Sequence, residues 1–476
     1  MNRTTSKKAL NRRQFLGRTA ATLAGLTIVS RHVLGGPKFV PPSEKVNIAI
    51  VGCGGQGQDN ARQLFLQPDA QIVALADPCE FHDLRASYHK AFAGRLPVKE
   101  LIEKKYSEKF PGFKVADYED FRVMLEKEKA IDAILCATPD HQHAYVSVTA
   151  MRQGKHVYCE KPLTHSVWEA RQVARVARET GVATQMGNQG HSGDSLRITC
   201  EMIWDGVIGQ VHEVHAWTSG SRNRKLTGGR PPEDPLPKGV NWDLWLGARE
   251  PRPFSSAYSP ARWRDFWDFG TGRIGDFFCH NFDPAFWALD LTQPLSVEAS
   301  AAGGVDSYIV PIGSMYTYQF GPRNGPHGAM PPVKAIWYDG GLMPPRPEGM
   351  EEDDQLGANG NGILFIGDKG ALTCAGWAGR ATLLPGSRDA EYKRPARVLP
   401  RSKGHHRDWL DACKGGPPAS ANFEYGAALT EVGLLGLVAQ RTGKKIYWDA
   451  KNMKAANAPE ADGFLKETYR AGWEVV

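Results

Sequence analysis

The stretch Lys45–Asp77, KVNIAIVGCGGQGQDNARQLFLQPDAQIVALAD, decides the fold of this chain. Its apolar run Val46–Val51 predicts one buried strand of a parallel sheet. Glycines 52, 54 and 57 follow in the spacing G-x-G-x-x-G, before a helical stretch and a second apolar run, Ile72–Ala76. This order of strand, glycine turn, helix and strand is typical of a dinucleotide-binding fold.

Each part of the glycine turn has a physical role when a dinucleotide is bound. Gly52 permits the tight turn, Gly54 lets the backbone approach the pyrophosphate, and Gly57 lets the helix pack close to the strand. The helix N-terminus then faces the phosphates with its free N–H groups. We therefore expect the cofactor to contact Gly52, Gly54, Gly55, Gln56 and Gly57. The alternative is a glycine-rich surface turn without a ligand.

The second strand ends on Asp77, twenty residues after Gly57. A carboxylate at this place can accept hydrogen bonds from both ribose hydroxyls of the adenosine half. The same carboxylate would repel a 2′-phosphate, so the sequence favours NAD over NADP as the cofactor.

Two domains are expected from the pattern along the chain. Strands alternate with helices over residues 45–187, which predicts a Rossmann domain with a doubly wound parallel sheet. Within it, residues 80–110 have a helical pattern with a break at Leu96-Pro97. Residues 188–476 are richer in alternating segments, which predicts an α/β domain with a mostly antiparallel open sheet. An apolar helix at about 427–440 is expected to pack back toward the first domain.

The exposed face of the second sheet would need to be covered, so we expect a homodimer or homotetramer. The eight cysteines include no C-x-x-C pair, and several lie in apolar surroundings. Buried free thiols are therefore expected, and no metal site.

The N-terminal sequence predicts a targeting segment. Residues 1–31 carry seven basic side chains and no acid, and Asn11–Leu16, NRRQFL, is similar to the twin-arginine export motif. The mild apolar segment Ala20–Val29 is too short to span a bilayer comfortably. We predict a signal and linker over residues 1–36, the twin-arginine machinery as a partner, a periplasmic location and no stable membrane insertion. A basic tail or an uncleaved anchor is the alternative.

The net charge of +6 is carried by that segment, so the rest of the chain is close to neutral. This balance gives no electrostatic reason to expect nucleic acid as a partner.

Two short segments carry residues suited to moving a hydride and a proton. Glu160-Lys161-Pro162 follows a short apolar strand, and Lys161 supplies positive charge where an alkoxide would form. Asp276 and His280 are spaced to share one face of a helix, and histidine titrates near neutrality, as a base requires. The alternatives are a surface lysine and a structural Asp–His hydrogen bond.

These segments, with the glycine turn, Thr138-Pro139 and the stretch GKHVYCEKP at 154–162, resemble the Gfo/Idh/MocA oxidoreductases. That family is named after glucose–fructose oxidoreductase and inositol dehydrogenase. The resemblance runs from about residue 45 to the end, and the Glu-Lys-Pro motif is its most specific mark. The export signal and the aromatic segment at 241–283 are similar to the secreted bacterial branch of the family.

The resemblance implies a substrate lying over the nicotinamide between the two domains. It implies Lys161 at the reacting hydroxyl, His280 as proton acceptor and Asp276 beside it. Glu160 would lie near the nicotinamide ribose. The remaining cofactor contacts that it implies are Thr138, Pro139 and His141.

Four further residues are expected to reach the substrate: Asn188, Gln189, Arg264 and Asp283. In one respect this chain departs from the family pattern. Many relatives have glycine two residues after the aspartate, where this chain has Phe278. We expect its ring to narrow the space near the nicotinamide.

The sequence therefore predicts an NAD(P)-dependent oxidoreductase that transfers hydride between nicotinamide and a secondary alcohol of a sugar, inositol or polyol. One alternative is an NAD-dependent glycosidase, which oxidises the sugar transiently and eliminates the aglycone. A second alternative is a non-catalytic nucleotide-binding protein.

Overall fold

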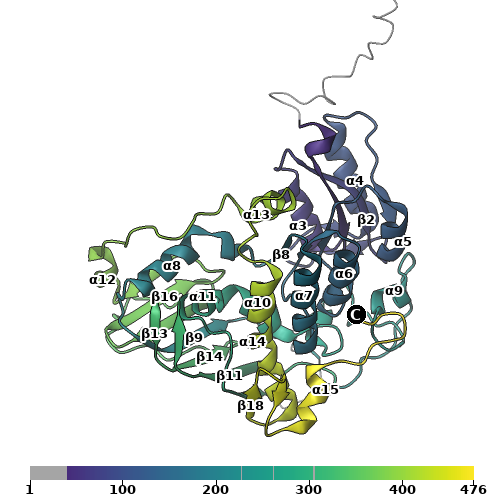
Figure 1. Cartoon of the computed structure of the whole chain (residues 1–476). Helices are drawn as coiled ribbons and strands as arrows, with labels where there is room; N and C mark the ends of the chain where they lie inside the picture. Colours follow the sequence, from purple (N-terminus) through teal and green to yellow (C-terminus); the bar gives the residue numbers. More distant parts are fainter. Residues whose placement is uncertain (1–39, 224, 227, 261, 304–305) are drawn as a thin grey trace, which may run out of the picture. The chain divides into compact units, whose positions relative to one another are not determined.

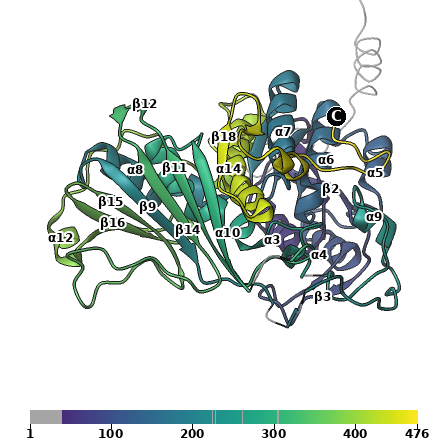
Figure 2. The same ribbon diagram turned by 90° about the horizontal axis from the view of Figure 1, so that it is seen from below.

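The computed structural model describes residues 40–476, except 224, 227, 261 and 304–305. The chain divides into two compact units, residues 1–45 and 46–476. Of the first unit, residues 40–45 are described, with a short 3-10 helix, η1 (Pro42–Glu44). The predicted export signal at 1–36 lies outside the described residues. All that follows concerns the second unit, shown in two views in Figures 1 and 2.

A six-stranded parallel sheet forms the first half of this unit, as predicted. Its strand order is β5-β2-β1-β6-β7-β8, and β1 lies at its centre between β2 and β6. The apolar run predicted as the first strand is β1 itself, with five of its six residues buried. The strands are β1 (Val46–Val51), β2 (Ala70–Ala76), β5 (Ala116–Tyr118), β6 (Ala133–Cys136), β7 (His156–Cys159) and β8 (Thr184–Met186).

Helices connect these strands and begin at residues that suit helix starts. Ser166 and Glu169 form a reciprocal capping box at the start of α7, and Gly181 ends that helix in the left-handed conformation. The helices of this half are α3 (Gly55–Leu64), α4 (Arg95–Ser107), α5 (Phe121–Lys127), α6 (Asp140–Arg152) and α7 (Val167–Thr180).

The helical pattern predicted for residues 80–110 is wrong in its first half. Residues 82–93 form a small hairpin, β3 (His82–Asp83) and β4 (Phe92–Ala93), and α4 starts only at Arg95. The predicted break at Leu96-Pro97 is also wrong. Proline is tolerated there because it occupies the first turn of α4, where backbone N–H groups have no intrahelical partner.

The second half contains a nine-stranded sheet in the order β17-β16-β15-β9-β14-β11-β10-β18-β19. Its pairs are antiparallel except β14 with β9, which confirms the predicted mostly antiparallel sheet. The strands are β9 (Val211–Thr218), β10 (Ser296–Ala302), β11 (Gly313–Phe320), β14 (Val333–Tyr338), β15 (Asn361–Gly367), β16 (Gly370–Ala375), β17 (Ala381–Leu384), β18 (Ile446–Asp449) and β19 (Lys454–Ala455). A separate hairpin pairs β12 (Arg323–Gly325) with β13 (Gly328–Met330).

The helix predicted at about 427–440 is α14 (Phe423–Thr442), the longest in the described part of the chain. It packs against α7 of the parallel half and against β10 and α10 of the second half, so it joins the two (Figures 1 and 2). The other helices are α8 (Asp194–Trp204), α9 (Trp242–Leu246), α10 (Gly272–Asn281), α11 (Asp283–Leu289), α12 (Gly386–Glu391), α13 (His405–Cys413), α15 (Asp462–Leu465), η2 (Gln189–Ser192), η3 (Trp263–Asp265) and η4 (Pro459–Ala461).

All eight cysteines are free, and seven of them are buried, as expected. Among the helices that the structure describes, none is both long and apolar enough to cross a membrane.

Candidate active site

The glycine turn has the geometry that close approach of a ligand requires. Gly52 has φ +93°, and a Cβ there would lie 2.5 Å from the carbonyl carbon of Ala137. A Cβ on Gly57 would lie 2.1 Å from the Gly52 oxygen, so α3 packs directly on the turn. A Cβ on Gly54 would meet no atom within 4 Å. The backbone at Gly54 is thus open to a ligand at the start of α3.

Asp77, directly after β2, accepts hydrogen bonds from the glycine turn and from the loop that follows β2. Its Oδ2 accepts a hydrogen bond from the Cys53 N–H at 2.6 Å, and its Oδ1 accepts one from the Cys79 N–H at 2.8 Å. Burial raises the pKa of this carboxyl above its ordinary value, although these hydrogen bonds act in the opposite direction. The carboxylate thereby ties the glycine turn to the loop after β2.

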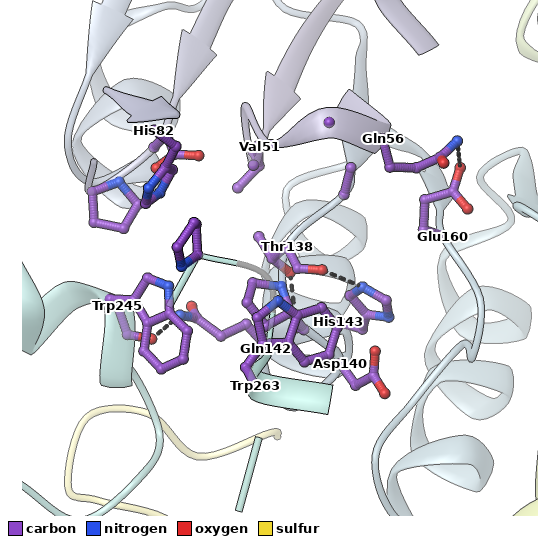
Figure 3. A pocket seen from close by; sticks show the side chains of 18 of the residues that line it. Val51, Gln56, His82, Thr138, Asp140, Gln142, His143, Glu160, Trp245 and Trp263 are labelled. Atoms are coloured by element: carbon purple, nitrogen blue, oxygen red, sulfur yellow. Dashed lines mark hydrogen bonds between the residues drawn. The ribbon is translucent and has the colours of Figure 1, made fainter. Parts of the chain in front are cut away.

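A cavity of about 400 Å³ extends from the glycine turn to α10. Figure 3 shows side chains from the parallel half and from the second half meeting around it. Its lining includes most of the predicted cofactor contacts and three predicted substrate or catalytic residues: Gly52, Gly54, Gly55, Gln56, Asp77, Thr138, Pro139, Glu160, Lys161, Arg264 and Asp276.

Glu160, directly after β7, lines the cavity and has one carboxylate oxygen without a partner among the described residues. Its Oε1 accepts hydrogen bonds from the side-chain amides of Gln56 (3.3 Å), Asn60 (2.9 Å) and Gln189 (3.1 Å). Its Oε2 is buried and has no hydrogen-bond partner among the described residues. Burial raises the pKa of the Glu160 carboxyl. The Oε2 atom lies beside Gly187, where an added Cβ would be 2.5 Å from it. Because a buried polar atom normally has a partner, it is a candidate acceptor for a ligand donor such as a ribose hydroxyl.

Lys161 and Asp276 meet across the two halves of the unit. The Lys161 Nζ donates to Asp276 Oδ1 at 2.7 Å and to the Asp276 carbonyl oxygen at 2.9 Å. Asp276 also binds Arg264 Nε (2.9 Å) and Arg273 Nη1 (3.2 Å). Burial alone would raise the pKa of Asp276, but the charges of Arg264, Lys161 and Arg273 hold it well below its usual value. Asp276 is therefore an anion that fixes three cations at the cavity wall.

His280 shares α10 with Asp276, as the spacing predicts, but it does not line the cavity. Four residues along a helix correspond to about 6 Å of rise, which carries His280 beyond the cavity wall. Its ring lies 6.0 Å from the ring of Trp377, and its Nδ1 has no partner among the described residues. Burial and the charge of Lys161 lower the pKa of His280 to about 3. The imidazole is therefore neutral near pH 7.

Of the two histidines at the start of α6, the one expected to contact the cofactor does not face the cavity, and the other does. His141 does not line the cavity; its Nε2 lies 3.1 Å from the Trp245 carbonyl oxygen, and its ring packs against Trp245 and Phe269. His143 does line it. Residues two apart on a helix point in nearly opposite directions, so only one of the two can face the cavity.

Of the four residues expected to reach substrate, only Arg264 lines the cavity. Asn188 Nδ2 donates to Asp283 Oδ2 at 3.0 Å, and both side chains are fully buried. Asp283 also lies 3.0 Å from His191 Nδ1 and accepts a hydrogen bond from the Tyr425 hydroxyl. Gln189 supports Glu160, as described above. These contacts place Asn188 and Asp283 within the protein interior and Gln189 behind the cavity wall.

The expectation for Phe278 is wrong. Its side chain is 1% exposed and packs against Phe282, Tyr318 and Trp337 in the core. On α10 it points away from Asp276, because residues two apart face opposite sides of a helix. Aromatic side chains that do line the cavity include Tyr88, Trp245 and Trp263, none of which was assigned to the site from the sequence.

Two groups of potential metal ligands occur in the described part of the chain, with ligand atoms within 4.8 Å of one another: Cys136, His143 and Cys159, and Asp77, Cys79 and His82. Both ring nitrogens of His143 already face carbonyl oxygens, of Pro162 at 2.7 Å and Thr138 at 2.9 Å. The Asp77 oxygens accept the backbone N–H groups named above. That the protein binds no metal stays a prediction.

Two family models match the chain. "Oxidoreductase family, NAD-binding Rossmann fold" matches residues 46–188, and "Oxidoreductase family, C-terminal alpha/beta domain" matches residues 217–322. Both describe the Gfo/Idh/MocA oxidoreductases, so the resemblance noted from the sequence is confirmed at the level of the family. The chain belongs to the Gfo/Idh/MocA oxidoreductase family and contains its NAD-binding Rossmann domain.

Similar curated proteins differ in the reactions that their names give. A 2,7-anhydro-N-acetylneuraminate hydratase from Mediterraneibacter gnavus is 28% identical over 182 residues, which are 38% of this chain and 42% of the relative. A scyllo-inositol 2-dehydrogenase (NAD(+)) from Bacillus subtilis is 29% identical over 144 residues, 30% of this chain and 35% of the relative. The chain thus spans less than half the length of these relatives.

A solved structure has the same fold over most of the chain. The WlbA dehydrogenase from Bordetella pertussis, in complex with NADH and UDP-GlcNAcA, aligns with a TM-score of 0.56 and 16% identity. The alignment covers 85% of this chain and 98% of that protein. At this identity the likeness extends to the fold alone.

Proposed function

We propose that the protein is an NAD-dependent oxidoreductase that transfers hydride between nicotinamide and a secondary alcohol of a sugar, inositol or related polyol. One observation carries the proposal: Lys161, fixed by Asp276, lines the same cavity as the open glycine turn and Asp77. A cofactor held at the turn would therefore extend toward an ammonium group that can stabilise an alkoxide.

The residues present fit a dinucleotide. The backbone at Gly54 is open, and the unpartnered Oε2 of Glu160 can accept a ribose hydroxyl. Asp77 would hold the adenosine ribose. Lys161, Arg264 and Arg273 line the cavity, and all three bind Asp276. No described residue forms an ion pair with Asp77. A 2′-phosphate would thus face a carboxylate that forms no ion pair among the described residues, although the charges of His82 and Arg95 act on it, and this repulsion supports NAD.

Lys161 is suited to bind the reacting hydroxyl. An ammonium group has three N–H donors, and Asp276 takes two of them. The third can donate to the substrate oxygen and stabilise the negative charge that develops as its proton leaves. When bound, nicotinamide supplies the acceptor for the hydride from carbon, and a carbonyl group forms.

The hydroxyl proton needs a base. His280 does not line the cavity, but it follows Asp276 by about one turn of α10, is neutral near pH 7, and has a ring nitrogen without a partner among the described residues. We therefore assign proton acceptance to it in the complex with substrate. His143 is nearer to the cavity, but both of its ring nitrogens already face carbonyl oxygens. Arg264 stacks on Trp263 at 4.2 Å and would hold a further polar group of the substrate.

A redox-neutral reaction is the second candidate, because a similar protein is a hydratase by name. There, oxidation next to a C–H bond would acidify it, elimination would follow, and the hydride would return. The same residues would serve, and no NADH would accumulate.

The test separates these functions. The purified protein would be denatured to release and identify any bound nucleotide, and the intact protein offered inositols, aldoses and aryl glycosides. Accumulating NADH supports the dehydrogenase, and aglycone release without NADH supports the redox-neutral reaction. Lys161→Ala should abolish either reaction, whereas Lys105→Ala, at an exposed lysine paired with Glu108, should not. Bound nucleotide that no substrate reduces would instead support a non-catalytic binding protein.

We propose in addition that the chain is exported to the periplasm through the twin-arginine machinery and that it forms a homodimer or homotetramer. The basic motif at residues 11–16 supports export. The open sheet of nine strands supports self-association.

A further inference from the structure

Hydrogen bonds hold the hairpin of β3 and β4 against the glycine turn and α3. The Gly94 N–H donates to the Cys53 carbonyl oxygen at 2.7 Å, and Gln58 Nε2 on α3 donates to the Phe92 carbonyl oxygen at 2.8 Å. Across the hairpin, the Leu84 N–H donates to the Ala91 carbonyl oxygen at 2.9 Å. The loop between the strands is therefore held beside the start of α3, where the phosphates of a dinucleotide bind.

His89, in this loop, lies against the first residue of α3. A Cβ built on Gly55 would fall 2.0–2.3 Å from atoms of the His89 ring, so the imidazole rests directly on the glycine backbone. His89 Nδ1 lies 3.0 Å from Asp59 Oδ2, which fixes the ring orientation. The space over the neighbouring Gly54 is open. A diphosphate over Gly54 would thus have the imidazole alongside it, with Nε2 as the free ring nitrogen.

Tyr88 extends the same loop across the cavity. Its ring lies 3.9 Å from that of His89 between centroids, and its side chain lines the cavity that Arg264 and Asp276 also line. Tyr88 is 81% exposed, so it lies at the mouth of the cavity rather than in its floor. The loop therefore covers the cavity from the parallel half.

We propose that Tyr88 and His89, in the loop between β3 and β4, form a cofactor clasp, in which His89 binds the diphosphate and Tyr88 covers the bound nucleotide and slows its release. The inference rests on the proposed use of NAD and adds a binding element outside the glycine motif. Burial lowers the pKa of His89 below its usual value, although Asp59 acts in the opposite direction. A diphosphate on the other side of the imidazole would add a further charge that favours the protonated form. A hydrogen bond between two charged groups is among the stronger kind in proteins.

The test compares ligands with and without the diphosphate. Dissociation constants for NAD⁺, ADP-ribose and adenosine would be measured by calorimetry with the nucleotide-free full chain. His89→Ala should weaken NAD⁺ and ADP-ribose by at least about tenfold and leave adenosine unchanged. Arg85→Gln is the matched control: it removes a cation from the same loop that is exposed and paired with Asp83, and it should change none of the three.

Gly55→Ala gives a second, independent variant. An added methyl group would displace the His89 ring, so Gly55→Ala should weaken NAD⁺ binding in the parent protein but add little in the His89→Ala background. Tyr88→Ala should raise the NAD⁺ dissociation rate measured by stopped flow.

Three results would overturn the clasp: unchanged NAD⁺ affinity in His89→Ala, tighter binding in that variant, or an equal loss for adenosine. Tighter binding would mean that the imidazole competes with the phosphates for their position. A parent protein that binds none of the three ligands refutes the proposed function as well, which distinguishes that failure from failure of the clasp alone.

Discussion

The substitution Glu160→Gln should weaken cofactor binding without lowering the free energy of unfolding. In the parent protein Oε1 satisfies three amide donors, while the buried Oε2 has no partner among the described residues. The glutamine oxygen can still accept from those amides, and the substitution removes a buried charge. The free energy of unfolding of the nucleotide-free protein should therefore stay within about 1 kcal/mol of the parent value or rise.

The affinity for NAD⁺, in contrast, should fall. A hydrogen bond to a charged acceptor contributes about 1.5–3 kcal/mol, so losing the ribose contact to Oε2 should weaken NAD⁺ by about ten- to 150-fold. Calorimetric titration with NAD⁺, together with urea denaturation of the same samples, measures both quantities.

Glu169→Gln is the matched control. Glu169 is also a buried carboxylate, but its oxygens accept hydrogen bonds from His165 N–H, Ser166 N–H and the Tyr469 hydroxyl. This variant should lose stability and keep its NAD⁺ affinity. Equal NAD⁺ affinity in Glu160→Gln and the parent would refute the assignment of Oε2 to the cofactor, and a large loss of stability would refute the argument from its missing partner.

Three further outcomes are expected. Lys161→Ala should lower kcat by about 10²–10³ while NAD⁺ affinity changes less than tenfold, and an unchanged kcat would exclude Lys161 from the reaction. The pKa of His280 is about 3 in the fold and near 6.5 in the unfolded chain, so stability should fall as pH drops from about 6.5 toward 3, because only the unfolded chain takes up the proton. His280→Gln should flatten urea-derived stability over that range by up to about 1.4 kcal/mol per pH unit, and parallel curves would contradict this. Replacing Arg12 and Arg13 with Lys should retain the protein in the cytoplasm on cell fractionation, whereas export of that variant would argue against the twin-arginine route.

The parallel half of the fold could be predicted because its signals are local. The run Val46–Val51 is a strand because five of its six residues are apolar, which suits a central position in a parallel sheet. Gly52 and Gly57 are required by contacts with the neighbouring backbone, which a short motif encodes. The same holds for the turn after β7, where Glu160 and Lys161 reach the cavity.

The hairpin at residues 82–93 could not be predicted from local preference. Its residues are held by hydrogen bonds to Cys53, Gln58 and Asp59, all contributed by the preceding turn and helix. Tertiary contacts of this kind override a helical pattern and leave no periodic trace in the sequence.

Site residues could be predicted where a motif places them at the end of a strand. They could not be predicted where the orientation of a helix decides which of its side chains face the cavity. His141 and His143 differ by about 200° around α6, and the sequence did not indicate which of them faces the cavity. Arg273 was not singled out, although it binds both Asp276 and Asp265, because its partners come together only when α10 and η3 pack. Phe278 was assigned to the cavity by analogy, and the packing of α10 on the second sheet turned it into the core.

A crystal structure of the full chain with NAD⁺ tests the central claim most directly. The account predicts the diphosphate over Gly54, the adenosine ribose on Asp77, the second ribose on Glu160 Oε2 and the nicotinamide ring beside Lys161. Nucleotide bound elsewhere, or a nicotinamide turned away from Lys161 and α10, would contradict it.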